Sequence, residues 1–185
     1  MSVSLSVTGL VGAYTLQFTG VSLTGVTSTP ITLSAGTATQ LAITTEPPAS
    51  AQSGLVIAPA TVVQVRDVSG NLVTTSTATV TLAIGTNPGG GTLSGTASTA
   101  AVAGVATFSN LSINAAGTGY TLTAASTGLT GATSSSFNIT AGGATKVVYL
   151  QQPSSAVAGA SISPAITVQI QDASNNVVTT STASI

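Results

Sequence analysis

The sequence predicts an all-β fold of tandem β-sandwich repeats, each about 105 residues long, and three observations lead to this prediction. Hydrophobic residues make up 43% of the chain, and Val, Ile, Leu and Ala alternate with Ser and Thr in short runs. Val, Ile and Thr favour strands because branching at Cβ restricts the rotamers that a helix requires. Twenty Gly and seven Pro supply turns between the runs. Finally, the chain repeats its own sequence.

The internal repeat is visible in two separate alignments. Residues 12–39 match residues 118–145 at an offset of 106, with 12 of 28 positions identical. Residues 62–80 match residues 167–185 at an offset of 105, with 11 of 19 positions identical. Self-similarity at a fixed spacing indicates that one structural unit recurs along the chain.

Alternation with a period of two predicts which side chains face the core. On the run 78–84, Val80 and Leu82 share one face and Thr79 and Thr81 share the other. The residues predicted to be buried are Val63, Val65, Val80, Leu82, Leu111, Ile113, Leu122, Phe137 and Ile139. Six to eight short strands in about 105 residues, with no helical stretch, predict an immunoglobulin-like sandwich.

The repeat divides the chain into three parts. We expect residues 1–36 to be the second part of an immunoglobulin-like repeat, residues 37–143 to be a complete repeat, and residues 144–185 to be the first part of a third. The connections at 35–37 and 141–143 are only a few residues long. Neighbouring repeats should therefore abut rather than swing freely.

The complete repeat resembles the bacterial immunoglobulin-like domains of invasin- and intimin-type adhesins and of large surface repeat proteins. The residues that carry the resemblance are Asp67-x-x-Gly70-Asn71, Thr79-Val80-Thr81-Leu82, Gly91-Thr92-Leu93-Ser94-Gly95, Gly104-Val105-Ala106-Thr107-Phe108 and Ala116-Gly117-Thr118-Gly119-Tyr120-Thr121-Leu122. The resemblance implies a sandwich fold in a tandem shaft, and it implies no particular ligand.

The small number of charged residues excludes nucleic acid as a partner. The five charged residues are Glu46, Arg66, Asp67, Lys146 and Asp172, and the net charge is −1. Nucleic-acid binding requires several Lys or Arg facing phosphates, so we expect none. The 59 Ser and Thr residues must supply most of the polar surface. With three carboxylates and no His, we expect a melting temperature that changes little between about pH 3 and pH 9.

Membrane and secretion signals are also lacking in the sequence. No run approaches the roughly 20 consecutive apolar residues of a membrane helix, so we expect no membrane insertion. Residues 1–7 alternate like a strand and do not resemble a signal peptide. An extracellular location therefore implies that a leader was removed or is not included.

The chain has no Cys and no His. It therefore lacks thiolate nucleophiles and the two commonest transition-metal ligands. The scattered carboxylates, one Lys and three Tyr form no arrangement of acid, base and nucleophile. We expect neither enzymatic activity nor a cofactor.

Asp67 and Asp172 lie in equivalent turns and are the best candidates for a site. In the first interpretation, each carboxylate accepts backbone N–H groups within its turn. In the second, each takes part in a Ca²⁺ site, although such sites need six to eight oxygens and each turn offers one carboxylate.

Three other features have local interpretations. Residues 89–91 superficially resemble a phosphate loop, but the absence of a following helix and Lys favours a hairpin loop. Lys146 would suit an internal isopeptide bond, but Gln40 occupies the matching position in the preceding repeat. Tyr120 and its counterpart Tyr14 are each expected to make a tyrosine-corner bond to nearby backbone.

These observations predict a non-catalytic, extracellular structural protein that acts as the stalk of a surface adhesin or as a fibre. Its partners would be neighbouring repeats of the same polypeptide or copies of itself. The first alternative is a filament subunit in which residues 144–185 of one chain join residues 1–36 of the next. The second is a module that binds a surface glycan, or ice, through Thr-rich faces.

Overall fold

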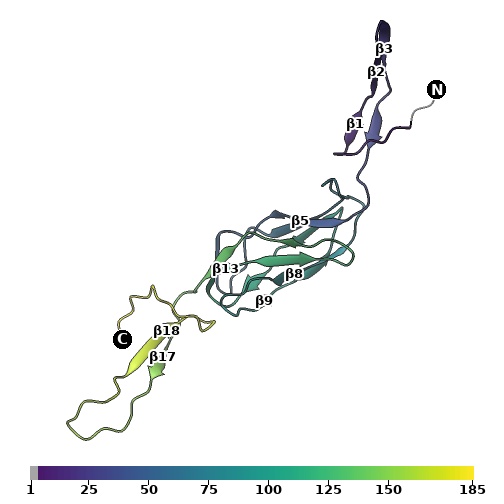
Figure 1. The fold of residues 1–185 in the computed structure, drawn as a ribbon. Helices are drawn as coiled ribbons and strands as arrows, with labels where there is room; N and C mark the ends of the chain where they lie inside the picture. The colour runs from purple at the N-terminus through teal and green to yellow at the C-terminus, as the bar shows by residue number, and fades with distance from the viewer. Residues whose placement is uncertain (1–3) are drawn as a thin grey trace.

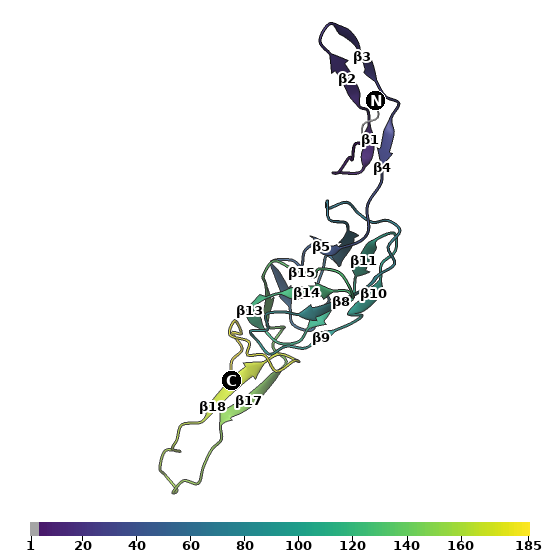
Figure 2. The same cartoon turned by 45° about the vertical axis from the view of Figure 1, so that its right-hand side comes forward.

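The computed structural model describes residues 4–185, which form strands and turns with no helix, so the predicted all-β class is confirmed. Within this described range, no segment forms a helix that could span a membrane. The chain is elongated, with a central body between two thinner end segments (Figure 1). The same order of parts is visible after rotation (Figure 2).

The central body contains twelve short strands. They are β5 (Gln40–Thr45), β6 (Ser50–Gln52), β7 (Thr61–Arg66), β8 (Thr79–Ile84), β9 (Leu93–Ser94), β10 (Ser98–Ala100), β11 (Val105–Phe108), β12 (Ser112–Ile113), β13 (Gly117–Tyr120), β14 (Leu122–Ala125), β15 (Ala132–Thr133) and β16 (Phe137–Thr140). They form sheets with the orders β10-β8-β14-β15, β11-β7-β5, β13-β16-β6 and β12-β9. All pairs are antiparallel except β16 with β6. This arrangement is consistent with a β-sandwich.

The strand number exceeds the six to eight expected, and one of the additional strands arises because the chain changes sheets within a predicted strand. The run 120–124 reads as one strand in sequence, but β13 pairs with β16 whereas β14 pairs with β8 and β15. The crossing occurs at Thr121, between the two strands. Gly119, with a φ of +90°, lies at the irregularity in the β13 ladder, where a residue without Cβ is tolerated.

One hydrophobic core lies between these strands. All nine residues predicted to be buried are at most 3% exposed. Tyr120 and Phe108 are the largest side chains that join them in the core. On β8, Val80 and Leu82 point inward while Thr79 and Thr81 are exposed, as the alternation predicts. Thr61 is buried beside this core, and its hydroxyl has no hydrogen-bond partner.

The end segments reproduce the strand pairing of the central body. The first contains β1 (Gly12–Tyr14), β2 (Gln17–Gly20), β3 (Leu23–Thr27) and β4 (Ile31–Leu33), and the last contains β17 (Lys146–Gln151) and β18 (Thr167–Gln171). Tyr14 pairs with Ile31 as Tyr120 pairs with Phe137. In the last segment, Val147 pairs with Ile170 as Leu41 pairs with Val65. The local pairing therefore forms even without a closed core.

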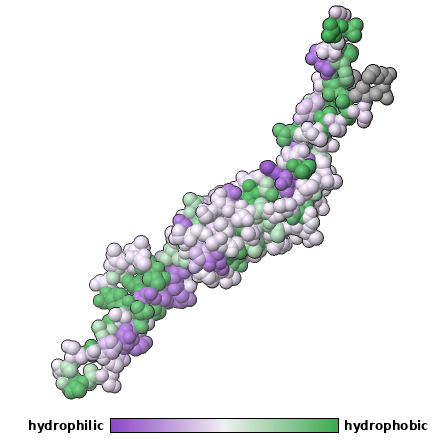
Figure 3. Space-filling view, in the orientation of Figure 1, coloured by the Kyte–Doolittle hydropathy of each residue, from purple (hydrophilic) through white to green (hydrophobic). Residues whose placement is uncertain are grey.

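Both end segments leave their apolar faces uncovered. Among the residues predicted to line these faces, Leu5, Val7, Tyr14, Ile31, Val147, Tyr149 and Ile185 are exposed, and Leu16, Leu33, Val168 and Ile170 are half-buried. Val3, also predicted to lie there, is outside the described residues. Apolar side chains gather at both extremities of the molecule (Figure 3).

Candidate inter-repeat junctions

Asp67 follows directly after β7 and organises a tight turn, which we call the first docking turn (residues 67–71). Its Oδ1 accepts hydrogen bonds from the N–H groups of Ser69 and Asn71, both at 2.9 Å. Its Oδ2 accepts from the linker N–H of Gly36 at 2.8 Å and from Asn71 Nδ2 at 2.9 Å. Gly70 has a φ of +84°, which closes the turn. The carboxylate thus joins the turn to the linker that precedes the repeat.

The side-chain amide of Asn71 reaches into the preceding segment. Its Nδ2 donates to Gly9 O at 2.9 Å, and its Oδ1 accepts from Val11 N at 2.9 Å. The two bonds flank Leu10, in the way that a neighbouring strand pairs with alternate main-chain groups. We call residues 9–11 the first receiving loop.

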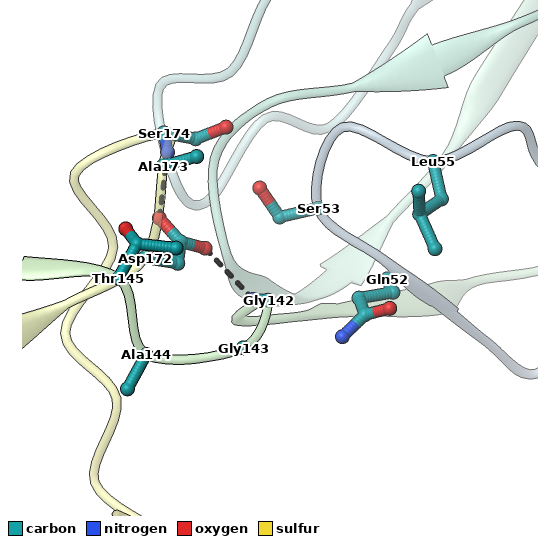
Figure 4. A pocket seen from close by; sticks show the side chains of 10 residues that line it. All are labelled: Gln52, Ser53, Leu55, Gly142, Gly143, Ala144, Thr145, Asp172, Ala173 and Ser174. Atoms are coloured by element: carbon teal, nitrogen blue, oxygen red, sulfur yellow. Dashed lines mark hydrogen bonds between the residues drawn. The ribbon is translucent and has the colours of Figure 1, made fainter.

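The second junction repeats this arrangement around Asp172, which follows β18. Oδ1 accepts from the N–H groups of Ser174 at 2.9 Å and Asn176 at 2.8 Å. Oδ2 accepts from the N–H of Gly142 at 2.7 Å and from Asn176 Nδ2 at 2.8 Å. Figure 4 shows the bonds from Asp172 to Gly142 and Ser174, beside an open hollow that Ser53 and Leu55 also line. Residues 172–176 form the second docking turn.

The amide of Asn176 contacts the second receiving loop, residues 114–116. Its Nδ2 lies 3.0 Å from Asn114 O, and its Oδ1 accepts from Ala116 N at 2.7 Å. Asn176 Nδ2 also lies 2.8 Å from Ser53 Oγ, which itself donates to Asn114 O at 2.7 Å. Asn176 therefore contacts two loops of the preceding repeat.

Each receiving loop is held by a tyrosine. The hydroxyl of Tyr120 donates to Ala115 O at 2.9 Å, and that of Tyr14 donates to Leu10 O at 2.7 Å. The predicted tyrosine-corner bonds are confirmed in both repeats. The carbonyl that each tyrosine holds belongs to the middle residue of the loop that the asparagine contacts.

The glycine-rich segment 89–91 lies beneath the second receiving loop. Asn87 closes it as a turn, because its Oδ1 accepts from Gly91 N at 2.7 Å and its Nδ2 donates to Gly91 O at 2.8 Å. A Cβ at Gly89 would lie 2.3 Å from Ala116 O and 2.4 Å from the Tyr120 hydroxyl. Glycine is required at position 89 because the receiving loop approaches its backbone closely.

The hydrogen bonds favour the ionised form of both aspartates. The side-chain amide of Asn71, followed by the N–H of Gly36, lowers the pKa of Asp67 from its usual 3.8 to about 2. At Asp172, burial acts to raise the pKa. The bonds from Asn176, Gly142 and Ser174 together outweigh that effect, so the pKa of Asp172 is also lowered.

The N–H groups around Asp67 and Asp172 argue against the calcium interpretation. A carboxylate offers about four lone-pair directions, and four N–H donors surround each of these two. Asn71 Oδ1 is likewise occupied by Val11 N. Among residues 4–185, no three acidic, His or Cys side chains are placed to hold one metal ion. This geometry favours the turn-forming interpretation.

Lys146 is half-buried on β17, and its Nζ donates to Asn175 Oδ1. Asn175 is exposed, and the nearby Asp172 carboxylate is occupied by its four donors. An isopeptide bond would need an acid free to assist the attack of the amine, so this pair forms a solvent-facing hydrogen bond.

Sequence reasoning singled out the aspartates but missed their asparagine partners. Asn71 and Asn176 align in the repeat, as do Gly36 and Gly142 before β5 and β17. The repeat itself pointed to these asparagines, because Asp, Ser and Asn are identical in the two docking turns while the positions between them differ. Ser53 carries no such signal, because Ala158 occupies the equivalent position at an offset of 105.

Comparison with known proteins finds no family model and no curated protein that matches this chain.

Proposed function

We propose that this chain is a section of an extracellular, non-catalytic shaft that holds another structure away from a bacterial cell surface, as in a surface adhesin or fibre. The shaft consists of tandem immunoglobulin-like sandwich repeats that follow one another with fixed orientation. The observation that carries this proposal is the recurrence, at both junctions, of the same contacts from Asp and Asn.

The contacts oppose bending at each junction. The linker is anchored through Gly36 or Gly142, and the receiving loop is anchored through the Asn side chain. Two anchors on different segments restrain both the distance and the rotation between neighbours. Repeating such a unit lengthens the object without adding chemistry.

The surface composition supports the same role. The abundant Ser and Thr residues supply a polar surface of hydroxyls, and with a net charge of −1 there is little electrostatic interaction between repeats for salt to screen.

Distance measurement between spin labels tests the proposal. The natural chain has no Cys, so introduced cysteines take labels selectively. The exposed pairs Thr24→Cys with Thr107→Cys, and Thr107→Cys with Thr167→Cys, span the first and second junctions. We expect one narrow distance distribution for each pair. Broad distributions at both junctions would overturn the proposal, and scattering that grows with protein concentration would instead favour the filament alternative.

Glycan binding is a second candidate, and one observation favours it. The outer face of β10-β8-β14-β15 is uncharged, and Thr79, Thr81 and Thr127 line an open hollow on it. A glycan array probed with the labelled chain tests this candidate, and loss of any signal in Thr79→Ala and Thr81→Ala variants would assign it to this face.

A further inference from the structure

The asparagine of each docking turn bonds to main-chain atoms of the receiving loop in the neighbouring repeat. Asn71 bonds to Gly9 O and Val11 N, and Asn176 bonds to Asn114 O and Ala116 N. None of these partner atoms belongs to a side chain. The docking turn therefore recognises the shape of the receiving loop and not its residue types.

The two receiving loops show this independence directly. Gly9-Leu10-Val11 and Asn114-Ala115-Ala116 have no residue in common. The main-chain partners of the two asparagines are nevertheless alike, at 2.9 and 2.9 Å in the first junction and 3.0 and 2.7 Å in the second. In the second junction the amide hydrogen that faces Asn114 O is shared with Ser53 Oγ at 2.8 Å.

The shape of each loop is fixed inside its own repeat. Tyr14 and Tyr120 hold the carbonyl of the middle loop residue, between the two groups that face the asparagine. The docking turn is equally self-contained, because Asp67 and Asp172 orient the amides of Asn71 and Asn176. Both halves of the junction are thus formed before the repeats meet.

We propose that the docking turn of any repeat of this kind accepts the receiving loop of any other, so that the repeats can be joined in any order. The partner of each docking turn is another copy of the chain's own repeat, recognised by a tyrosine-held loop and an anchored linker glycine. This inference rests on the proposed shaft function and adds to it that the shaft can gain or lose whole repeats without redesign of its junctions.

Among the described residues, Ser53 provides the only side-chain group of the preceding repeat that is hydrogen-bonded to Asn176. Its equivalent in the third repeat is Ala158, which has no hydroxyl. A junction that follows the third repeat would lack this bond. Under our proposal Ser53 is therefore dispensable, and the main-chain contacts suffice.

A duplication within the full chain tests the proposal. Residues 1–142 are joined to residues 37–185, so that the second copy of Asn71 faces the first copy of the loop 114–116, a pairing that the natural chain does not contain. Spin labels on Thr107→Cys in each copy report the new junction. We expect a distance distribution as narrow as that across the natural second junction.

Removal of the asparagine amide tests whether its two hydrogen bonds to the preceding loop hold the new junction in place. Asn71→Ala in the second copy keeps the main-chain bonds of the turn but removes the bonds to the preceding loop. It should raise the population of undocked junctions about tenfold, as expected for two lost hydrogen bonds. Asn87→Ala in the second copy is the matched control. That amide bonds only within its own repeat, and in the second copy it lies under the loop 114–116 of that copy, which is not part of the new junction. The label distance distribution across the new junction should stay narrow.

The outcomes separate the two proposals. A broad distance distribution at the new junction, with narrow ones in the natural chain, overturns order independence and leaves the shaft function intact.

If the duplicated chain fails to fold, a second experiment exchanges the docking turn within the natural chain. Ala173→Val and Asn175→Gly place the residues of the first docking turn at the second junction through two exposed positions. An unchanged distribution then supports the proposal, and a broadened one overturns it.

Discussion

The carboxylate of Asp67 and the side-chain amide of Asn71 are joined by a hydrogen bond of 2.9 Å between Nδ2 and Oδ2. This bond uses one hydrogen of the amide and leaves the other to face Gly9 O in the preceding segment. The charge of the aspartate thus controls the orientation of the group that contacts the neighbouring repeat. The carboxylate of Asp172 holds the amide of Asn176 in the same way at 2.8 Å, and there the other hydrogen lies between Ser53 Oγ and Asn114 O.

Acid should weaken the fold and the junctions together. Because the pKa of Asp67 falls from 3.8 to about 2 on folding, its contribution to stability is present above about pH 4 and is lost as the pH falls towards 2. The sequence suggested a melting temperature that stays constant down to about pH 3. We now expect a plateau at higher pH and a decline that begins below about pH 4, measured by circular dichroism.

The control for this prediction is Asp67→Asn, which removes the titrating group. The variant should melt at a lower temperature than the natural chain near neutral pH. Its further decline in acid should be smaller, since only Asp172 then titrates among the two docking turns. The melting temperature and the junction distances of the natural chain could instead be the same at about pH 2 and pH 7. That result would contradict the stabilisation of the fold and the junctions by the ionised aspartates.

Thr61→Val should stabilise the central body. The Thr61 side chain is 1% exposed and its hydroxyl has no partner, so the folded state carries the cost of removing that group from water. Valine has a similar shape without the hydroxyl, and Ile166 occupies the equivalent position in the third repeat. We expect the free energy of unfolding in urea to rise by about 1 kcal/mol.

Thr81→Val is the matched control, because Thr81 is exposed on β8 and its hydroxyl bonds to Ser98 at 2.9 Å. It should change stability by less than about 0.5 kcal/mol. A loss of stability in Thr61→Val would indicate that the hydroxyl is hydrogen-bonded in solution.

Much of the fold could be predicted from local patterns. Period-two alternation placed Val80 and Leu82 in the core because one face of that strand is buried and the other meets solvent. The tyrosine corners were predictable because each bond spans only four or five residues.

The junction contacts were less predictable. Asn71 contacts groups 60 and 62 residues away, and those groups are main-chain atoms, which leave no mark in the side-chain pattern. The change of sheet at Thr121 was missed for a related reason. Inward and outward positions continue with a period of two across it, so the sequence does not reveal that the pairing partner has changed.

Gly89→Ala should destabilise the central body and loosen the second junction. The added Cβ would lie 2.3 Å from Ala116 O, so the receiving loop must move. Overpacking of this kind costs about 1–3 kcal/mol. We expect a matching fall in the free energy of unfolding and a broader label distance between Thr107→Cys and Thr167→Cys.

Gly143→Ala serves as the control, since a Cβ there meets nothing within 4 Å and Thr37 occupies the equivalent position before β5. Equal effects of the two substitutions would mean that general stiffening of the chain, and not contact with the receiving loop, explains the result.

Tyr120→Phe separates the stability of a repeat from the docking of its neighbour. The ring is fully buried and packs against Phe137 with centroids 6.1 Å apart, and phenylalanine keeps that packing. The lost bond to Ala115 O should cost about 1 kcal/mol. Because this bond shapes the second receiving loop, the distribution of label distances across the second junction should broaden while that across the first stays narrow.

Tyr14→Phe should do the reverse. It should broaden the distance distribution across the first junction with little effect on the core, since Tyr14 is 38% exposed. If either variant broadens both junctions or neither, the tyrosines act on stability alone and the loops are shaped by other contacts.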